Sequence, residues 1–242
     1  SLSGKIFKPH KRVKKDSLTD SSVSETKEDE RKNFQLILVS SGGGGTTYLM
    51  EYLKKYTTLK MNHEHDTDGL KHFSFHSFED LNELQTERIV FLFNDPALAI
   101  ESHFRREWSQ VQLEKHGNPH KLKYLSEMGG KERFYEDVIQ KKRDLYGIKE
   151  QIDFFSSGKL PAPVLFVHFL DLAKPEILES LAEFLGQDIA VFNELEVRET
   201  RHSKKADLPP EYVRIYDKLY LSMVSLSGKI FKPHKRVKKD SL

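Results

Sequence analysis

The chain has 242 residues, of which 37% are hydrophobic and 31% are charged, and its formal net charge is +2. This length is sufficient for one sizeable α/β domain. The chain has no cysteine, which excludes disulfides and thiol catalysis. No apolar run approaches the roughly 18 residues that a membrane span needs. Because the sequence also shows no signal-peptide pattern, we expect a cytoplasmic protein without a membrane span.

The two ends of the chain are identical, since residues 1–18 and 225–242 share one sequence. Each copy carries a net charge of +5, so the two copies contribute +10 to a total of +2 and leave about −8 for residues 19–224. Basic runs of this kind are typical of polyanion contacts, nuclear addresses or solvated tails. Packing of Ile230 and Phe231 after the last helix would favour the second copy as the native one.

The segment between the first copy and the first apolar run, residues 16–33, is rich in Ser, Thr, Glu, Asp and Lys. Such a composition is typical of a disordered linker. We therefore expect a basic tail with a linker at 1–33, an α/β domain at 34–224 and a basic segment at 225–242.

A run of four glycines is the most informative feature of the sequence. An apolar run at 34–39 precedes it and predicts a buried strand, and a stripe of apolar residues within 49–56 follows it and predicts a helix. Glycines let a backbone turn closely around an anion, and free N–H groups at a helix start then bind phosphate oxygens. The predicted phosphate cradle consists of Gly42, Gly43, Gly44, Gly45, Thr46 and Thr47. A glycine-rich turn with no ligand is the alternative.

The same loop argues against an ordinary ATPase or GTPase. A Walker A loop needs Lys followed by Ser or Thr after its last glycine, to reach the terminal phosphates and hold magnesium. Thr46 stands where that Lys would be. The expected ligand is therefore a phosphate compound whose chemistry does not depend on a Lys and Mg²⁺ pair.

The rest of the domain alternates between predicted strands and helices. The strands are expected at 70–75, 88–93 and 164–169, and the helices at 96–112, 131–155, 175–185 and 209–221. This alternation predicts an α/β fold, a three-layer P-loop-type domain with a central parallel sheet flanked by helices. Ligands of such sheets bind at the carboxyl ends of the strands, where both the glycine loop and Asn94 are expected.

Four motifs resemble those of the sulfotransferase family, in the family's order. Residues 45–49, Gly-Thr-Thr-Tyr-Leu, resemble its G-T-T-W-L loop. Residues 88–102 resemble its second motif, in which a Ser follows six residues after a Pro, as Ser102 follows Pro96 here. Residues 163–172 and 184–186 are similar to its late strand ending in Asp-Leu and to the helix end after it. The chain thus resembles a divergent member of this family over most of residues 34–186.

The resemblance implies an enzyme that moves a sulfuryl group from 3′-phosphoadenosine-5′-phosphosulfate to the hydroxyl of a small-molecule or carbohydrate acceptor, leaving adenosine 3′,5′-bisphosphate and requiring no metal. It implies that Ser102 binds the 3′-phosphate. It implies that His72 is the general base, because residues 70–72 resemble the family's Lys-Thr-His. His76, on the same face of the expected strand, is the second candidate for the base.

The sequence departs from the family where cations are expected. Gly43 replaces the family's loop Lys, and Asn94 replaces the Arg that grips the 3′-phosphate. Lys71 is a candidate substitute for the first, and Arg105, with Arg106 beside it, for the second. Arg201 lies in a basic region that corresponds roughly to the family's late phosphate clamp, together with Arg198, Lys204 and Lys205.

Two other functions fit the same loop. One is a divergent P-loop kinase, which magnesium dependence would reveal. The other is a non-catalytic nucleotide-binding protein, which would bind the cofactor without turnover.

Overall fold

The three long apolar runs form the parallel part of a four-stranded sheet. The structure, a computed structural model, describes residues 34–74, 77, 81, 84–116, 130–197 and 204–234. Strands β1 (Phe34–Val39), β2 (Thr86–Phe93) and β3 (Val164–His168) are parallel neighbours in this order. Strand β4 (Ile230–Phe231) pairs with β3 in the antiparallel direction. The chain therefore has the expected α/β fold with a mostly parallel central sheet.

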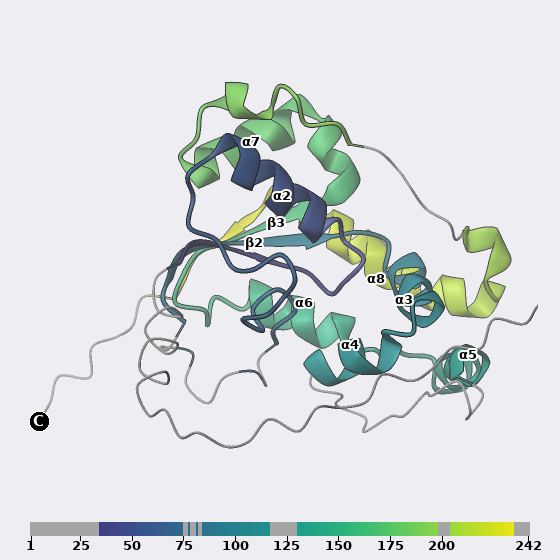
Figure 1. Cartoon of the computed structure of the whole chain (residues 1–242). Coiled ribbons are helices and arrows are strands. Elements are labelled where there is room, and N and C mark those ends of the chain that lie inside the picture. The colour runs from purple at the N-terminus through teal and green to yellow at the C-terminus, as the bar shows by residue number, and fades with distance from the viewer. Residues whose placement is uncertain are drawn as a thin grey trace, which may run out of the picture. The chain divides into compact units, whose positions relative to one another are not determined.

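Helices cover both faces of this sheet, as the near-continuous apolar character of its strands requires. One face packs against α2 (Thr46–Tyr56) and α7 (Pro175–Leu185). The other packs against α3 (Pro96–Arg105), α4 (Ser109–Lys115), α5 (Gly130–Lys141), α6 (Ile148–Ser156) and α8 (Pro210–Val224). Figure 1 shows α2 and α7 on one side of β2 and β3, with α6 and α4 on the opposite side. Short 3₁₀ turns lie at Phe169–Ala173, Ile189–Phe192 and Lys205–Asp207.

Two of the expected helices are each divided in two. The expected helix 96–112 ends at Arg105 and resumes at Ser109, because Glu107 adopts a left-handed conformation with φ of 60°. The expected helix 131–155 is likewise interrupted after Lys141, where Lys142 has φ of 52°. Left-handed residues other than glycine or asparagine are uncommon, so the sequence gives no warning of these breaks.

The strand expected at 70–75 is wrong for the residues that the structure describes. Residues 70–74 form a turn and irregular chain. The Asn62 side chain takes the place of a neighbouring strand beside β1, since its Oδ1 accepts from the Leu38 N–H at 2.8 Å and its Nδ2 donates to the Leu38 carbonyl at 3.0 Å. One side-chain amide thus satisfies both backbone groups of Leu38, where a neighbouring strand would otherwise pair.

The second copy of the terminal repeat contributes the sheet's short fourth strand. Phe231 packs edge-on against Phe166 of β3, with ring centroids 5.3 Å apart. Polyanion contact was expected from the basic residues of 1–18 and 225–242. The first copy and residues 235–242 lie outside the described residues.

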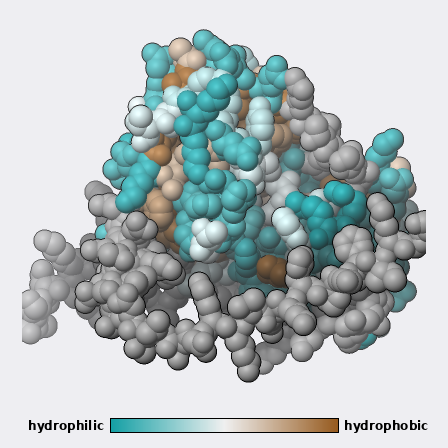
Figure 2. Space-filling view, viewed as in Figure 1, coloured by the Kyte–Doolittle hydropathy of each residue, from teal (hydrophilic) through white to brown (hydrophobic). Residues whose placement is uncertain are grey.

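Hydrophilic residues cover most of the described surface on the face shown in Figure 2, and hydrophobic residues emerge only in small patches. Within the described ranges, no helix combines the length and the apolar character that crossing a membrane requires.

Candidate functional site

The glycine loop between β1 and α2 has a backbone that side chains would obstruct. Gly42, Gly43 and Gly45 have positive φ values of 87°, 64° and 81°. A Cβ on Gly44 would lie 2.8 Å from the Leu92 carbonyl oxygen. Each of the four positions thus requires glycine for its conformation or for its space.

This loop forms one wall of a cavity of about 390 Å³ at the carboxyl end of the sheet. The cavity brings together residues from the loop, the start of α2, the irregular chain between α2 and β2, and the α3–α4 region. Its lining consists of Ser40, Gly42, Gly43, Gly44, Gly45, Thr46, Thr47, Tyr48, Lys71, His72, Ser102, His103, Arg105, Arg106, Trp108 and Gln112. Most of the residues predicted for the site therefore line one space.

The start of α2 presents open backbone donors to this cavity. Gly45 precedes the helix in a left-handed conformation, and no side chain caps the first turn. Thr46 donates its hydroxyl to Ser40 Oγ at 2.7 Å, and the Gly42 N–H donates to the same oxygen at 3.2 Å. Ser40 thereby ties both ends of the loop together, a role signalled in the sequence only by its position between the strand and the glycines. Uncapped N–H groups with the positive end of the helix dipole favour an anion here.

Lys71 supplies a cation to this loop from a different segment of the chain. Its side chain is buried, and its Nζ donates to the Thr47 hydroxyl and, at 2.6 Å, to the Glu64 carbonyl oxygen. Its backbone is held as well, because its N–H donates to Asp66 Oδ1 at 2.8 Å and its carbonyl accepts from the Ser40 N–H at 3.0 Å. Burial lowers the pKa of Lys71.

His72 lies next to Lys71 and is oriented by the strand end. Its Nδ1 is 2.9 Å from the Ser40 carbonyl oxygen. A carbonyl can only accept, so Nδ1 carries the proton and Nε2 keeps its lone pair. Burial lowers the pKa of His72 to about 4, so the ring is neutral at pH 7. His72 is therefore an oriented proton acceptor that lines the cavity.

The opposite wall carries Ser102 and two arginines of the α3 end. Arg105 Nη2 lies 3.5 Å from Ser102 Oγ, and Arg106 Nε donates to the Ser102 carbonyl at 3.1 Å. The Arg106 guanidinium also lies 4.8 Å from the ring centre of Trp108. These cations surround the hydroxyl that was predicted to bind a phosphate.

The floor under the loop contains a residue that the sequence analysis missed. A Cβ on Gly42 would come within 2.4 Å of His103 Nε2, so the His103 ring packs directly against the backbone of Gly42. His103 Nδ1 lies 2.8 Å from the Tyr146 hydroxyl, which donates to the Ser109 carbonyl at 3.3 Å. Burial lowers the pKa of His103. The ring therefore acts as a rigid neutral support for the loop, and its position directly after Ser102 was the only available signal.

The aromatic residues beside the loop form an edge-to-face pair. Tyr48 lines the cavity with 38% of its surface exposed, and its ring centre is 6.1 Å from that of Phe169. The Tyr48 hydroxyl donates to the Glu196 carbonyl at 2.6 Å, which fixes the ring. An exposed, fixed aromatic face is a surface on which a nucleobase can stack.

One predicted site residue lies outside this group, and two lie outside the described residues. Asn94 is buried and its side-chain oxygen accepts from the Asp95 N–H at 2.9 Å, outside the cavity lining. His76 and Arg201 lie outside the described residues, as does Arg198. Of the neighbouring basic residues, Lys205 pairs with Asp95 at 2.6 Å.

Comparison with known proteins gave matches among solved structures, but none among family models or curated proteins. A crystal structure of mouse sulfotransferase SULT7A1 complexed with PAP matches with 14% sequence identity and a TM-score of 0.43, covering 84% of this chain and 89% of that one.

Proposed function

We propose that the chain binds 3′-phosphoadenosine-5′-phosphosulfate at the glycine loop and transfers its sulfuryl group to an acceptor hydroxyl. The 5′-phosphosulfate lies against the loop N–H groups and the start of α2. The 3′-phosphate lies against Ser102 and Arg105, and the adenine stacks on Tyr48. Each of these groups lines the same cavity.

The position of Lys71 is the observation that carries this proposal. The loop has no lysine of its own, and Gly43 leaves no room for one, since a Cβ there would lie 3.0 Å from the Ala99 Cβ and 3.1 Å from its Cα. Lys71 instead reaches the Thr47 hydroxyl from the irregular chain between α2 and β2. An ammonium at that point stabilises the charge that develops on the leaving phosphate.

His72 completes the proposed chemistry. The acceptor oxygen attacks sulfur, the bond between sulfur and the 5′-phosphate oxygen breaks, and the acceptor proton moves to His72 Nε2. The bond from Nδ1 to the Ser40 carbonyl holds the ring in the tautomer that this step needs. A positioned general base of this kind contributes about 10²–10⁴ to a rate.

The charges of the cavity favour this reading over a divergent kinase. Among the described residues, the lining contains Lys71, Arg105 and Arg106 but no aspartate or glutamate. A kinase holds Mg²⁺ through oxygen ligands that include carboxylates. A polyanion that needs no metal fits a lining of cations and N–H donors better.

Ligand-induced stabilisation tests the proposal. Adenosine 3′,5′-bisphosphate at about 100 times its dissociation constant should stabilise the native chain by about 2.7 kcal/mol. Adenosine 5′-monophosphate should bind more weakly, and magnesium should not be required. Ser102→Ala should lower the affinity for the bisphosphate but not the affinity for the monophosphate, because only the bisphosphate carries a 3′-phosphate. A folded chain that shows no shift at millimolar bisphosphate, or that prefers ATP with magnesium, would contradict the proposal.

Transfer itself separates the enzyme from a non-catalytic binding protein. The chain should release adenosine 3′,5′-bisphosphate from 3′-phosphoadenosine-5′-phosphosulfate when sugars, phenols or steroids supply a hydroxyl. Tight binding of the cofactor without release for any acceptor would favour the non-catalytic alternative.

A further inference from the structure

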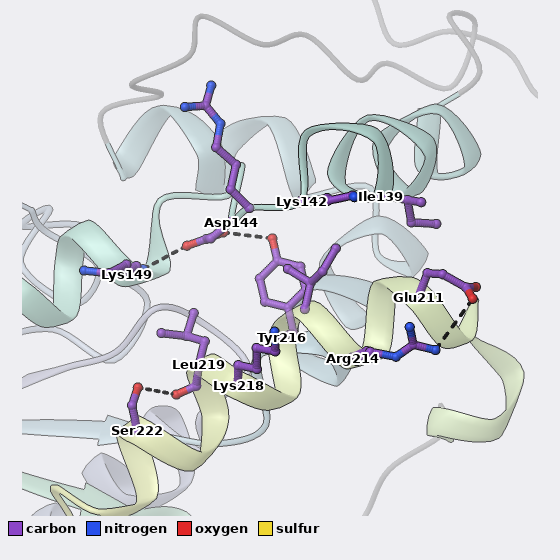
Figure 3. Close-up of a pocket in the computed structure, with 12 residues that line it drawn as sticks. Ile139, Lys142, Asp144, Lys149, Glu211, Arg214, Tyr216, Lys218, Leu219 and Ser222 are labelled. Carbon is purple, nitrogen blue, oxygen red and sulfur yellow. Dashed lines mark hydrogen bonds and ion pairs between the residues drawn. The ribbon is translucent and has the colours of Figure 1, made fainter.

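A second cavity lies between α5, α6 and α8 and shares no residue with the glycine-loop cavity. Its volume is about 620 Å³, which is within the range of about 300–1,000 Å³ that is typical of small-molecule sites. Figure 3 shows α8 along one side, with the end of α5 across from it. We propose that this cavity binds an aliphatic monoanion of the medium-chain fatty acid class.

The floor of this cavity is apolar and continuous with the core. Ile139 of α5 and Ile215 and Leu219 of α8 are partly buried against the core cluster on this face of the sheet. The Tyr216 ring also lines the cavity, and its hydroxyl is occupied because it donates to Asp144 Oδ1 at 2.8 Å. Such a surface gains free energy when an aliphatic chain covers it.

The rim of the cavity carries an excess of positive charge. Five cationic residues and two carboxylates line it. Asp144 also accepts from the backbone N–H groups of Tyr146 and Lys149, each at 2.8 Å, and Glu211 lies 3.7 Å from Arg214. Both carboxylates thus already have partners.

Three of the cations remain for a ligand. Lys149 is occupied by Asp153 at 2.5 Å, whereas the exposed side chains of Lys142, Arg143 and Lys218 form no ion pair with the described part of the chain. In Figure 3, Lys142 lies beside Ile139, and Lys218 lies beside Leu219 on α8. An apolar floor below unpaired cations complements a ligand with an apolar body and one anionic end.

Two probes with the same chain and opposite charges test the proposal by calorimetry on the full chain. Decanoate should bind saturably with one site per chain, and decyltrimethylammonium should bind at least tenfold more weakly. Equal affinities would show that the cationic rim plays no part, and the absence of saturable decanoate binding would overturn the proposal directly.

Substitutions locate the binding. Lys142→Gln and Lys218→Gln should each lower the affinity for decanoate by roughly two- to fivefold, as expected for an exposed ion pair. Leu219→Gln should weaken it further by removing part of the floor. Lys141→Gln is the matched control, because Lys141 is exposed beside Lys142 but does not line the cavity. Equal effects of the control and the rim variants would overturn the assignment.

The chain's single tryptophan distinguishes the two cavities. Trp108 lines the glycine-loop cavity and is 54% exposed. Decanoate binding should leave its fluorescence unchanged. A change of Trp108 emission that follows the decanoate isotherm would place the probe at the glycine loop and contradict the proposal.

Discussion

The two sides of the glycine-loop cavity are built in different ways. The loop itself offers backbone N–H groups and no charged side chain, and four glycines fix its shape. The irregular segment 60–74 offers the opposite, since it lacks regular structure at residues 70–74 but supplies Lys71 and His72. The loop thus supplies backbone geometry, and segment 60–74 supplies the cation that contacts the start of α2. A glycine loop without its own lysine is thus approached by a lysine from another segment of the chain.

Removing the imidazole of His72 should have the largest effect. His72→Ala should lower turnover by about 10²–10⁴ and leave cofactor binding largely intact, because the phosphate contacts lie elsewhere. Since burial lowers the pKa of His72 to about 4, the wild-type rate should be nearly independent of pH above about 5 and should fall below it. Steady-state rates from pH 4 to 8 test both statements. Normal turnover of the variant on a verified acceptor would show that the base lies elsewhere.

Adding a methyl group to the loop tests the other side of the comparison. Gly42→Ala places a Cβ 2.4 Å from His103 Nε2, in addition to the cost of φ at +87°. We expect a loss of about 2–5 kcal/mol, from overpacking of about 1–3 kcal/mol and left-handed strain of about 1–2 kcal/mol. Gly69→Ala is the control, since φ is +73° there but nothing lies within 4 Å. Denaturant unfolding of both variants gives the difference, and equal losses would remove the packing argument.

Acid should destabilise the site through its buried histidines. Burial lowers the pKa of His72 and of His116 to about 4 and lowers that of His103 as well. The unfolded chain takes up these protons near pH 6.5, so stability is lost as pH falls from about 6.5 towards 4. The slope should be about 1.4 kcal/mol per pH unit for each histidine. Denaturant unfolding at several pH values measures it, and a slope unchanged by His116→Gln would contradict this assignment.

Deleting residues 1–18 should have the smallest effect. Their sequence is repeated at 225–242, where Ile230 and Phe231 already form β4. Melting temperature and bisphosphate affinity should therefore stay the same. A loss of several degrees would show that the first copy contributes to the folded chain.

The sequence revealed the loop more clearly than the side chains that face it. Four glycines after an apolar run indicate a loop whose backbone conformation side chains would obstruct. Ser102 was predicted from its spacing to Pro96. Lys71 and His72 were named as candidates, although the strand expected to carry them does not form. Their placement depends on Ser40, whose N–H donates to the Lys71 carbonyl and whose carbonyl accepts from His72, and no local pattern encodes these contacts.

The missed features share one physical cause. The helix breaks at Glu107 and Lys142 depend on left-handed residues that are not glycine, which tertiary packing must impose. The support of Gly42 by His103 is likewise a contact between segments that are distant in the sequence. Periodicity and spacing report local structure, so they predicted the three parallel strands and the loop but not these contacts.

The affinity for adenosine 3′,5′-bisphosphate in wild type and in Lys71→Met tests most directly whether segment 60–74 supplies the loop's cation. Losing a hydrogen bond to a charged group costs about 1.5–3 kcal/mol, so the dissociation constant should rise about 10- to 150-fold. The affinity for adenosine 5′-monophosphate should fall by the same factor, because the Lys71 ammonium contacts the start of α2 and not Ser102. Lys141→Met, an exposed substitution on α5, should change neither. A folded Lys71→Met chain that binds the bisphosphate as tightly as wild type would contradict the account.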